Sequence, residues 1–243
     1  IVLIVFMFLS ATNFALHYRA IHGRWIYFRD AEFKFYFFYW LITCVLLTLI
    51  VWRSIHPDNL PLAVREAFFS GTALLTTTGF CTADFDLWPA AAKIILVLAM
   101  LVGGCAGSTA GAIKQVRVLV VLKRIVRGVW QFMHPQAVLP LKLGRQYIEP
   151  TVADHISTYF GLYLLVFALG SLGVSCFTDG ETALTAVATT LGGVGPGFSL
   201  AGAMETYAPF AAPAKVILIL CMLMGRLEFY ALFAILFPRF WRR

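Results

Sequence analysis

The strongest constraint on this chain is a series of apolar segments that are long enough to cross a lipid bilayer. The hydrocarbon core of a bilayer is about 30 Å thick and is spanned by about 20 residues of α-helix. Segments 33–52 and 156–176 have this length, and segments 89–121 and 213–237 contain further apolar runs. Only 13% of the residues are charged, against about 25% in a soluble domain. The sequence therefore predicts an all-α integral membrane protein.

The chain begins at Ile1, inside another apolar stretch that continues to about His17. No basic segment precedes this stretch, so it does not resemble a signal peptide. We expect it to be the end of a longer membrane helix, and the chain to be a fragment of a longer protein.

Residues 33–130 and 153–243 repeat the same order of segments. Each contains a span, a short segment rich in Ala, Leu and Thr, a loop rich in Thr or Gly, and a second span. Residues 92–104 align without a gap to residues 214–226, with eight of these 13 positions identical. Internal repeats are common in transport proteins. We therefore expect two repeats of span, short helix, loop and span.

The remaining segments fit around these repeats. Residues 1–32 would hold the end of the earlier helix and a connection, and residues 131–152 would form a connector or hairpin. The short segments 61–75 and 180–190 cannot span a bilayer.

The distribution of Lys and Arg predicts the topology. Four basic residues lie in the connections that hold the short segments, whereas 14 of 19 lie in the other connections: Arg19, Arg24, Arg29, Lys34, Lys114, Arg117, Lys123, Arg124, Arg127, Lys142, Arg145, Arg239, Arg242 and Arg243. Basic loops face the cytoplasm, so we expect a multi-pass protein with a cytoplasmic C-terminus. The net charge of +7 follows from this topology, and no nucleic-acid partner is needed to explain it.

Each predicted short helix is followed at once by a loop with the chemistry of an ion filter. These loops are Thr76–Phe80 and Gly193–Pro196. Rings of backbone carbonyls can replace the water around a dehydrated K⁺, and Gly reaches the backbone angles that turn carbonyls inward. Such a loop is tolerated inside a membrane where it lines a wet cavity or is buried in protein. The alternative is that both loops are surface turns, but their matching positions in the two repeats favour a pore.

The Gly-rich stretch 103–111 lies deep within the second span of the repeat 33–130 and has two interpretations. Gly103, Gly107 and Gly111 have the GxxxG spacing of close helix packing. Alternatively the helix is broken, because Gly, Ser and Thr weaken a helix. The stretch is not a nucleotide-binding P-loop, since no Gly-Lys-Ser/Thr follows.

Arg226 aligns with Gly104 in the repeat. Because Gly104 lies deep within its span, we expect Arg226 to lie near the middle of the membrane. An arginine there is costly in contact with lipid, so its presence indicates a functional role. The alternative is a structural arginine that pairs with Glu228 or with carbonyl groups.

These motifs together resemble the Trk/Ktr/HKT superfamily of potassium transporters, in its TrkH branch. The resemblance rests on Thr-Thr-Thr-Gly-Phe, Gly-Val-Gly-Pro-Gly-Phe, Met-Gly-Arg-Leu-Glu and the terminal Pro-Arg-Phe-Trp-Arg-Arg, and on His-Tyr-Arg and Arg-Asp-Ala-Glu-Phe near the start. It covers essentially the whole chain, as the end of repeat two followed by repeats three and four. The resemblance leads us to expect Asn at the position of Gly193 in many relatives, so the sequence departs from the family pattern there.

The resemblance implies a single-chain pseudo-tetramer in which each of four repeats contributes one filter strip. It places K⁺ on the carbonyls of Thr77, Thr78, Gly79, Gly193, Val194 and Gly195. It also implies a gate below the filter, formed by a non-helical loop and an arginine: Gly103, Gly104, Gly107, Ser108, Thr109, Gly111 and Arg226.

What the resemblance implies about function is K⁺ uptake by gated conduction in the bacterial cytoplasmic (inner) membrane, with any symport left open. It implies no cofactor besides the transported K⁺. The implied partners are membrane lipid, the two absent repeats, a second copy in a homodimer, and a TrkA-type ring of nucleotide-binding subunits. Na⁺ or mixed conduction is the alternative. A membrane enzyme or assembly subunit is disfavoured, because no HExxH, paired intramembrane carboxylates or nucleophile–His spacing is present.

Overall fold

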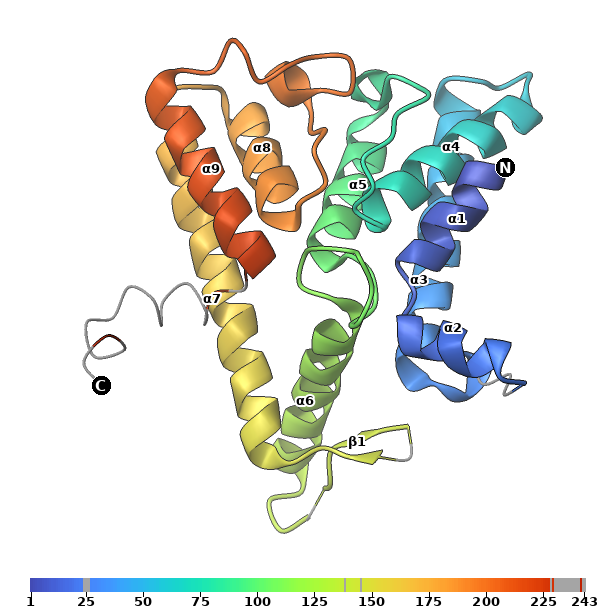
Figure 1. Cartoon of the computed structure of the whole chain (residues 1–243), viewed down its shortest axis with the longest axis vertical. Helices are drawn as coiled ribbons and strands as arrows, with labels where there is room; N and C mark the ends of the chain where they lie inside the picture. The colour runs from blue at the N-terminus through green and yellow to red at the C-terminus, as the bar shows by residue number, and fades with distance from the viewer. Residues whose placement is uncertain (24–26, 138, 145, 228, 230–240, 242–243) are drawn as a thin grey trace.

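The computed structural model describes residues 1–23, 27–137, 139–144, 146–227, 229 and 241. The predicted all-α fold is confirmed (Figure 1). The helices are α1 (Val2–Ser10), α2 (Phe14–Ile21), α3 (Ala31–Ser54), α4 (Leu60–Leu75), α5 (Ala90–Val102), α6 (Gln115–Met133), α7 (Pro150–Ser175), α8 (Gly180–Gly192) and α9 (Ala212–Leu227), with short 3-10 turns η1 (Tyr27–Arg29), η2 (Phe85–Leu87) and η3 (Ser199–Ala201). Strands β1 (Lys142–Leu143) and β2 (Gln146–Tyr147) pair antiparallel, so the connector contains a hairpin.

Helices α3 and α7 are the two described helices that are long and apolar enough to cross a membrane individually. Helix α3 begins where Asp30 Oδ1 accepts a hydrogen bond from Phe33 N at 2.8 Å. Helix α7 begins at Pro150, which suits a first helical position because no intrahelical N–H is needed there. Both helices present large apolar side chains to their surroundings, as a lipid-facing helix must: Phe38, Ile42, Leu46, Leu49, Leu165, Leu169 and Leu172.

Helices α4 and α8 are the two short helices that the repeat predicted. Asn59 and Asp179 cap them, accepting hydrogen bonds from Leu62 N at 3.1 Å and Thr182 N at 3.0 Å. Helix α4 packs on α3, and α8 packs against both α7 and α9 (Figure 1). The last turns of both helices are buried without interruption, at residues 69–75 and 185–192. Each short helix therefore ends inside the protein, where its following loop is held.

The second span of the third repeat is broken. Helix α5 ends at Val102, α6 begins at Gln115, and residues 103–114, called the intramembrane segment below, are not helical (Figure 1). Gly103 and Gly107 both have φ of +71°, a left-handed conformation that Gly adopts without a steric penalty. The broken-helix interpretation is confirmed, and the GxxxG interpretation of a continuous helix is wrong.

The first apolar stretch is also broken, whereas the sequence predicted one helix end. Helices α1 and α2 are bent by 106° across residues 11–13. Asn13 Oδ1 accepts a hydrogen bond from Ala15 N at 2.9 Å and so starts α2 as a new helix. The freed carbonyls of the bend accept hydrogen bonds from the intramembrane segment: Cys105 N donates to Ala11 O at 2.9 Å. Two breaks that lie far apart in the sequence thus satisfy each other's backbone groups.

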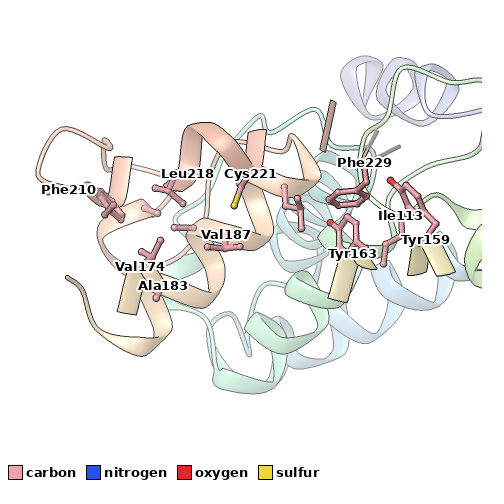
Figure 2. Close-up of a cluster of buried hydrophobic side chains, with 14 residues drawn as sticks. Ile113, Tyr159, Tyr163, Val174, Ala183, Val187, Phe210, Leu218, Cys221 and Phe229 are labelled. Atoms are coloured by element: carbon pink, nitrogen blue, oxygen red, sulfur yellow. The ribbon is translucent and has the colours of Figure 1, made fainter. Parts of the chain in front are cut away.

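Two clusters of buried apolar side chains organise the described core. One joins α7, α8 and α9 and includes Tyr163, Val187 and Leu218 (Figure 2). Another joins the third repeat to the loop after α8, where the rings of Phe85 and Phe198 meet edge to face at 5.3 Å. Such aromatic pairs contribute about 0.5–1.5 kcal/mol beyond their buried area. The second cluster fixes the two repeats relative to each other.

Some sequence predictions lie outside the described residues. The last predicted span is described to Leu227 and again at Phe229. Glu228, the remainder of that span at 230–237, and the basic residues Arg24, Arg145, Arg239, Arg242 and Arg243 are not among the described residues.

Candidate functional site

The loop after α4 folds back onto the end of its own helix. The amides of Thr78 and Gly79 both donate to Ala73 O, at 2.9 and 3.1 Å, and the hydroxyls of Thr76 and Thr78 lie 2.8 Å apart. The loop after α8 does the same, since Val194 N donates to Thr189 O at 2.8 Å. In both loops the helix end engages amide groups of the chain that follows.

Both loops share an alternating backbone conformation. The φ angle is +56° at Thr77 and +74° at Gly79, and it is +67° at Gly193 and +110° at Gly195. The residue between each pair does not have a positive φ. When left-handed residues alternate with ordinary ones, successive N–H groups gather on one side of the chain. Such a backbone allows successive carbonyls to gather on the other side, as a carbonyl-lined ion path requires.

The two loops lie side by side although they are more than 100 residues apart in the sequence. A Cβ atom added to Gly79 would collide with Val194 O and would lie 3.0 Å from Pro196 Cδ. By contrast, a Cβ atom added to Gly193 or Gly195 would meet no atom within 4 Å. The structure therefore brings the two loops that the resemblance assigned to the filter into contact at Gly79 and Val194.

The fourth-repeat loop has a brace that the sequence did not reveal. The Tyr207 hydroxyl donates to Gly195 O at 2.8 Å and lies 3.0 Å from Thr189 Oγ1. Burial raises the pKa of Tyr207, despite the opposing hydrogen bond from Thr189, so the hydroxyl remains a protonated donor at neutral pH. A lone Tyr in a connecting loop carries no spacing signal, and only its position in the fold identifies it.

A further contact missed in the sequence ties the outer ends of the repeats together. Lys93 Nζ lies 2.9 Å from Asp86 Oδ1 and 2.8 Å from Glu181 Oε1. The second oxygen of Asp86 accepts a hydrogen bond from Ser199 N at 2.8 Å. The third repeat thereby holds the chain just beyond the fourth-repeat loop. The sequence signal that could have drawn attention to Lys93 is its recurrence as Lys215 in the aligned segment.

The intramembrane segment lies directly against both loops. Gly111 N donates to Thr77 Oγ1 at 2.9 Å. A Cβ atom added to Gly111 would collide with the carbonyl of Gly192, at the end of α8. The segment is thus packed at the inner end of both short helices, below the predicted filter strips.

Arg226 reaches this segment from α9. Its Nη1 atom donates to Thr109 O at 3.4 Å, and a cavity of about 180 Å³ lies between Arg226 and Ser108, Thr109 and Gly111. Of the two partners that the structural alternative named, a carbonyl is present, and Glu228 is outside the described residues.

The remaining predicted gate residues face elsewhere. A Cβ atom on Gly104 would lie 2.9 Å from Ala11 O, and one on Gly107 would lie 3.1 Å from Asn13 Oδ1. A Cβ atom on Gly103 would lie 2.6 Å from Gly111 O, which belongs to the same segment. These three glycines let the segment pack against itself and against the α1–α2 bend, whereas residues 108–111 face the arginine.

Two re-entrant helix–loop units on a frame of membrane-spanning helices define a polytopic membrane protein of the pore-loop class. The family model of TrkH, described as "Cation transport protein", matches residues 1–240. The chain therefore belongs to the TrkH family of cation transport proteins, a family of transporters and not of enzymes.

Relatives and a solved structure agree with this assignment. The chain is 34% identical over 241 residues to "Trk system potassium uptake protein TrkH" of Halomonas elongata, covering 98% of this chain and 49% of that protein. It is 32% identical over 244 residues to the protein of the same name from Escherichia coli K12, covering 99% and 50%. The crystal structure of the potassium transporter TrkH from Vibrio parahaemolyticus superposes with a TM-score of 0.90 at 33% identity, covering 98% of this chain and 52% of that one. The chain spans about half the length of the curated relatives it matches.

Proposed function

We propose that this chain forms half of a K⁺-uptake pore and supplies two of four carbonyl strips to its selectivity filter. The alternating backbone at Thr77–Gly79 and Gly193–Gly195 carries this proposal, because it occurs at matching positions in adjacent loops. The strips are the carbonyls of Thr77, Thr78, Gly79, Gly193, Val194 and Gly195. Two loops supply half of a four-fold ring, so two further repeats complete the filter.

K⁺ is the proposed cargo, and no resident cofactor is proposed. The similar proteins are named potassium uptake proteins, and glycine at both Gly79 and Gly195 supports preference for K⁺ over Na⁺. A bulkier residue at either position would disturb the angles that aim the carbonyls inward. A Na⁺ or mixed transporter of the same superfamily is the alternative, and the ratio of K⁺ to Na⁺ permeability distinguishes the two.

The proposed gate consists of the intramembrane segment and Arg226. The segment contacts Thr77 and the end of α8, so it lies where an ion leaving the filter would pass. The guanidinium group adds a positive charge beside it, and like charges repel strongly in a passage of low dielectric constant. Movement of the segment would open the path.

The wider assembly follows from the same proposal. Residues 33–130 and 153–243 act as repeats three and four, residues 1–32 end repeat two, and residues 131–152 form the cytoplasmic connector. The protein would lie in a bacterial inner membrane with a cytoplasmic C-terminus, surrounded by lipid. A second copy and a TrkA-type nucleotide-binding ring are its proposed protein partners, and symport remains a second mode of transport through the same path.

Uptake by a K⁺-deficient bacterium tests the proposal. The full-length transporter that contains this chain should restore growth at low external K⁺ and take up Rb⁺ in proteoliposomes. Residues 1–243 alone should do neither, because half a filter cannot surround the ion. Failure of the folded full-length protein to take up Rb⁺ would overturn the proposed function, and growth supported by a monomeric 1–243 chain would overturn the two-of-four arrangement.

A further inference from the structure

Glu32 is a buried carboxylate in the first turn of α3, with 7% of its surface exposed. A buried charge is costly unless hydrogen bonds compensate for its lost hydration. Its position beside the intramembrane segment is unexpected, because the sequence shows only two acidic residues, Asp30 and Glu32, at the start of an apolar run.

The hydrogen bonds of Glu32 come from both ends of the intramembrane segment. Oε1 accepts one from Ala106 N at 2.5 Å and another from Val116 N at 3.2 Å. Ala106 lies just after the segment begins, and Val116 lies in the first turn of α6. Carboxylates are favoured at helix N-termini, where amides lack intrahelical partners. One oxygen atom therefore fixes the start of the segment relative to the helix that follows it.

Backbone bonds also join the two ends of the break, since Lys114 N donates to Val102 O and Gln115 N donates to Gly104 O, both at 2.9 Å. The other described hydrogen bonds tie the segment to itself or to elements other than α3. Gly111 N bonds to Thr77 Oγ1, Thr109 O accepts from Arg226, and Gln115 Nε2 donates to Gly103 O at 2.7 Å. Backbone bonds to the α1–α2 bend hold its outer surface. Glu32 differs from these because it joins α3, the first span of the repeat, to both ends of the break.

We propose that Glu32 is the positioning residue that holds the intramembrane segment closed across the ion path. This inference rests on the proposed function, in which the segment is the gate. Both amides share the single acceptor Oε1, so a change at this atom weakens both hydrogen bonds together. Weakening this acceptor releases the segment while the filter loops, which Glu32 does not contact in any described hydrogen bond, stay in place.

The chain contains its own reporter of segment position. Cys105 belongs to the segment, is 1% exposed, and donates its amide to the α1–α2 bend. Cys44 lies in the middle of α3 and is 0% exposed. Release of the segment should expose Cys105 but not Cys44, whereas general loosening of the fold would expose both.

The experiment uses the full-length transporter in proteoliposomes, with either Cys105 or Cys44 kept as the reactive cysteine. Glu32→Gln should raise the rate of Cys105 modification by a small charged methanethiosulfonate about tenfold, and Glu32→Ala should raise it further. Rb⁺ uptake should rise in the same order, and Cys44 modification should not change. Glu149→Gln, an exposed carboxylate before α7, is the matched control and should behave as wild type.

Two results would overturn the inference. One is wild-type Cys105 modification and Rb⁺ uptake in folded Glu32 variants, and the other is a parallel rise at Cys105 and Cys44. Deletion of residues 103–112 tests the gate separately. If the folded deletion variant takes up no more Rb⁺ than wild type, the proposed gate fails, while Cys105 modification still decides whether Glu32 holds the segment.

Discussion

The third and fourth repeats contain the same elements in the same order, but their second spans differ in structure. In the third repeat the chain leaves the helix at Gly103 and crosses below the loops before α6 begins. In the fourth, α9 continues through the aligned positions Gly225 and Arg226. A repeated sequence thus produces one short helix and loop in each repeat, while the third repeat adds the intramembrane segment and the fourth adds the arginine that faces it.

The local sequences explain this difference. After Gly103 the third repeat continues with nine residues that are mostly Gly, Ala, Ser and Thr, whereas α9 continues with Arg226 and Leu227. Each glycine costs about 1 kcal/mol in a helix relative to alanine, and this run has four, at 103, 104, 107 and 111. The break then survives because Glu32, Thr77 and the α1–α2 bend accept hydrogen bonds from the freed amides. The shared order of elements provides the frame, and local differences in sequence produce the two parts of the proposed gate.

The largest expected effect concerns the aligned glycines Gly225 and Gly103. Ala normally stabilises a helix relative to Gly, but a Cβ atom on Gly225 would collide with Leu191 O. Gly225→Ala should lower the free energy of unfolding by about 3 kcal/mol, and Gly103→Ala by about 2 kcal/mol because its φ is +71°.

Thermal unfolding of the full-length protein in detergent measures both effects. Gly161→Ala in α7 is the control, since no atom lies within 4 Å of its added Cβ, and it should be neutral or stabilising. Equal stability of all three variants would show that α9 does not approach α8 as closely as the structure indicates.

The second comparison concerns Gly79 and Gly195 in the two loops. Gly79→Ser adds a collision with Val194 O to the strain of a positive φ, whereas Gly195→Ser adds the strain alone. That strain is about 1–2 kcal/mol. We expect Gly79→Ser to reduce the K⁺/Na⁺ permeability ratio at least about tenfold, and Gly195→Ser to reduce it less. Reversal potentials under bi-ionic conditions give the ratio, and unchanged selectivity in both variants would remove these glycines from the filter.

The third comparison concerns Arg226, which the fourth repeat carries where the third repeat has Gly104. Arg226→Gln keeps a donor for Thr109 O but removes the positive charge beside the proposed path. Rb⁺ flux in proteoliposomes should rise about fivefold, because a like charge in a passage of low dielectric constant opposes cations. Arg53→Gln, at an exposed position near the end of α3, should leave flux unchanged. A folded Arg226→Gln protein with wild-type or lower flux would contradict an electrostatic barrier.

The smallest effect should come from the aligned lysines Lys93 and Lys215. Lys93 pairs with Asp86 and Glu181 across the repeats, while Lys215 Nζ donates to the Ala208 carbonyl at 2.9 Å. Solvent reaches the Lys93 network, so Lys93→Met should cost about 1 kcal/mol or less, and Lys215→Met should cost less still. The difference in melting temperature should shrink at 1 M salt, because ions screen exposed charges. A difference that persists at high salt would mean that the network is not stabilised by charge.

Much of the architecture could be predicted from the sequence alone. The lengths of the apolar segments predicted the spans, and the positions of Thr and Gly predicted where α4 and α8 end and their loops begin. The Gly-rich run allowed two interpretations from its residues, since the same spacing suits a packing face or a break. The bend at residues 11–13 was not predicted. Ser10, Thr12 and Asn13 interrupt the apolar stretch there, but a few small polar residues are a weak signal for a break.

Only the tertiary structure decided which groups meet. Hydropathy and local propensity act between neighbours in sequence, so they determine helices, loops and the sides of a membrane. They do not determine that Val194 O lies against Gly79, that Tyr207 braces Gly195, or that Glu32 joins both ends of the intramembrane segment. Those contacts arise when buried backbone groups of broken helices must find hydrogen-bond partners, and the partners available are set by the packing of the whole chain.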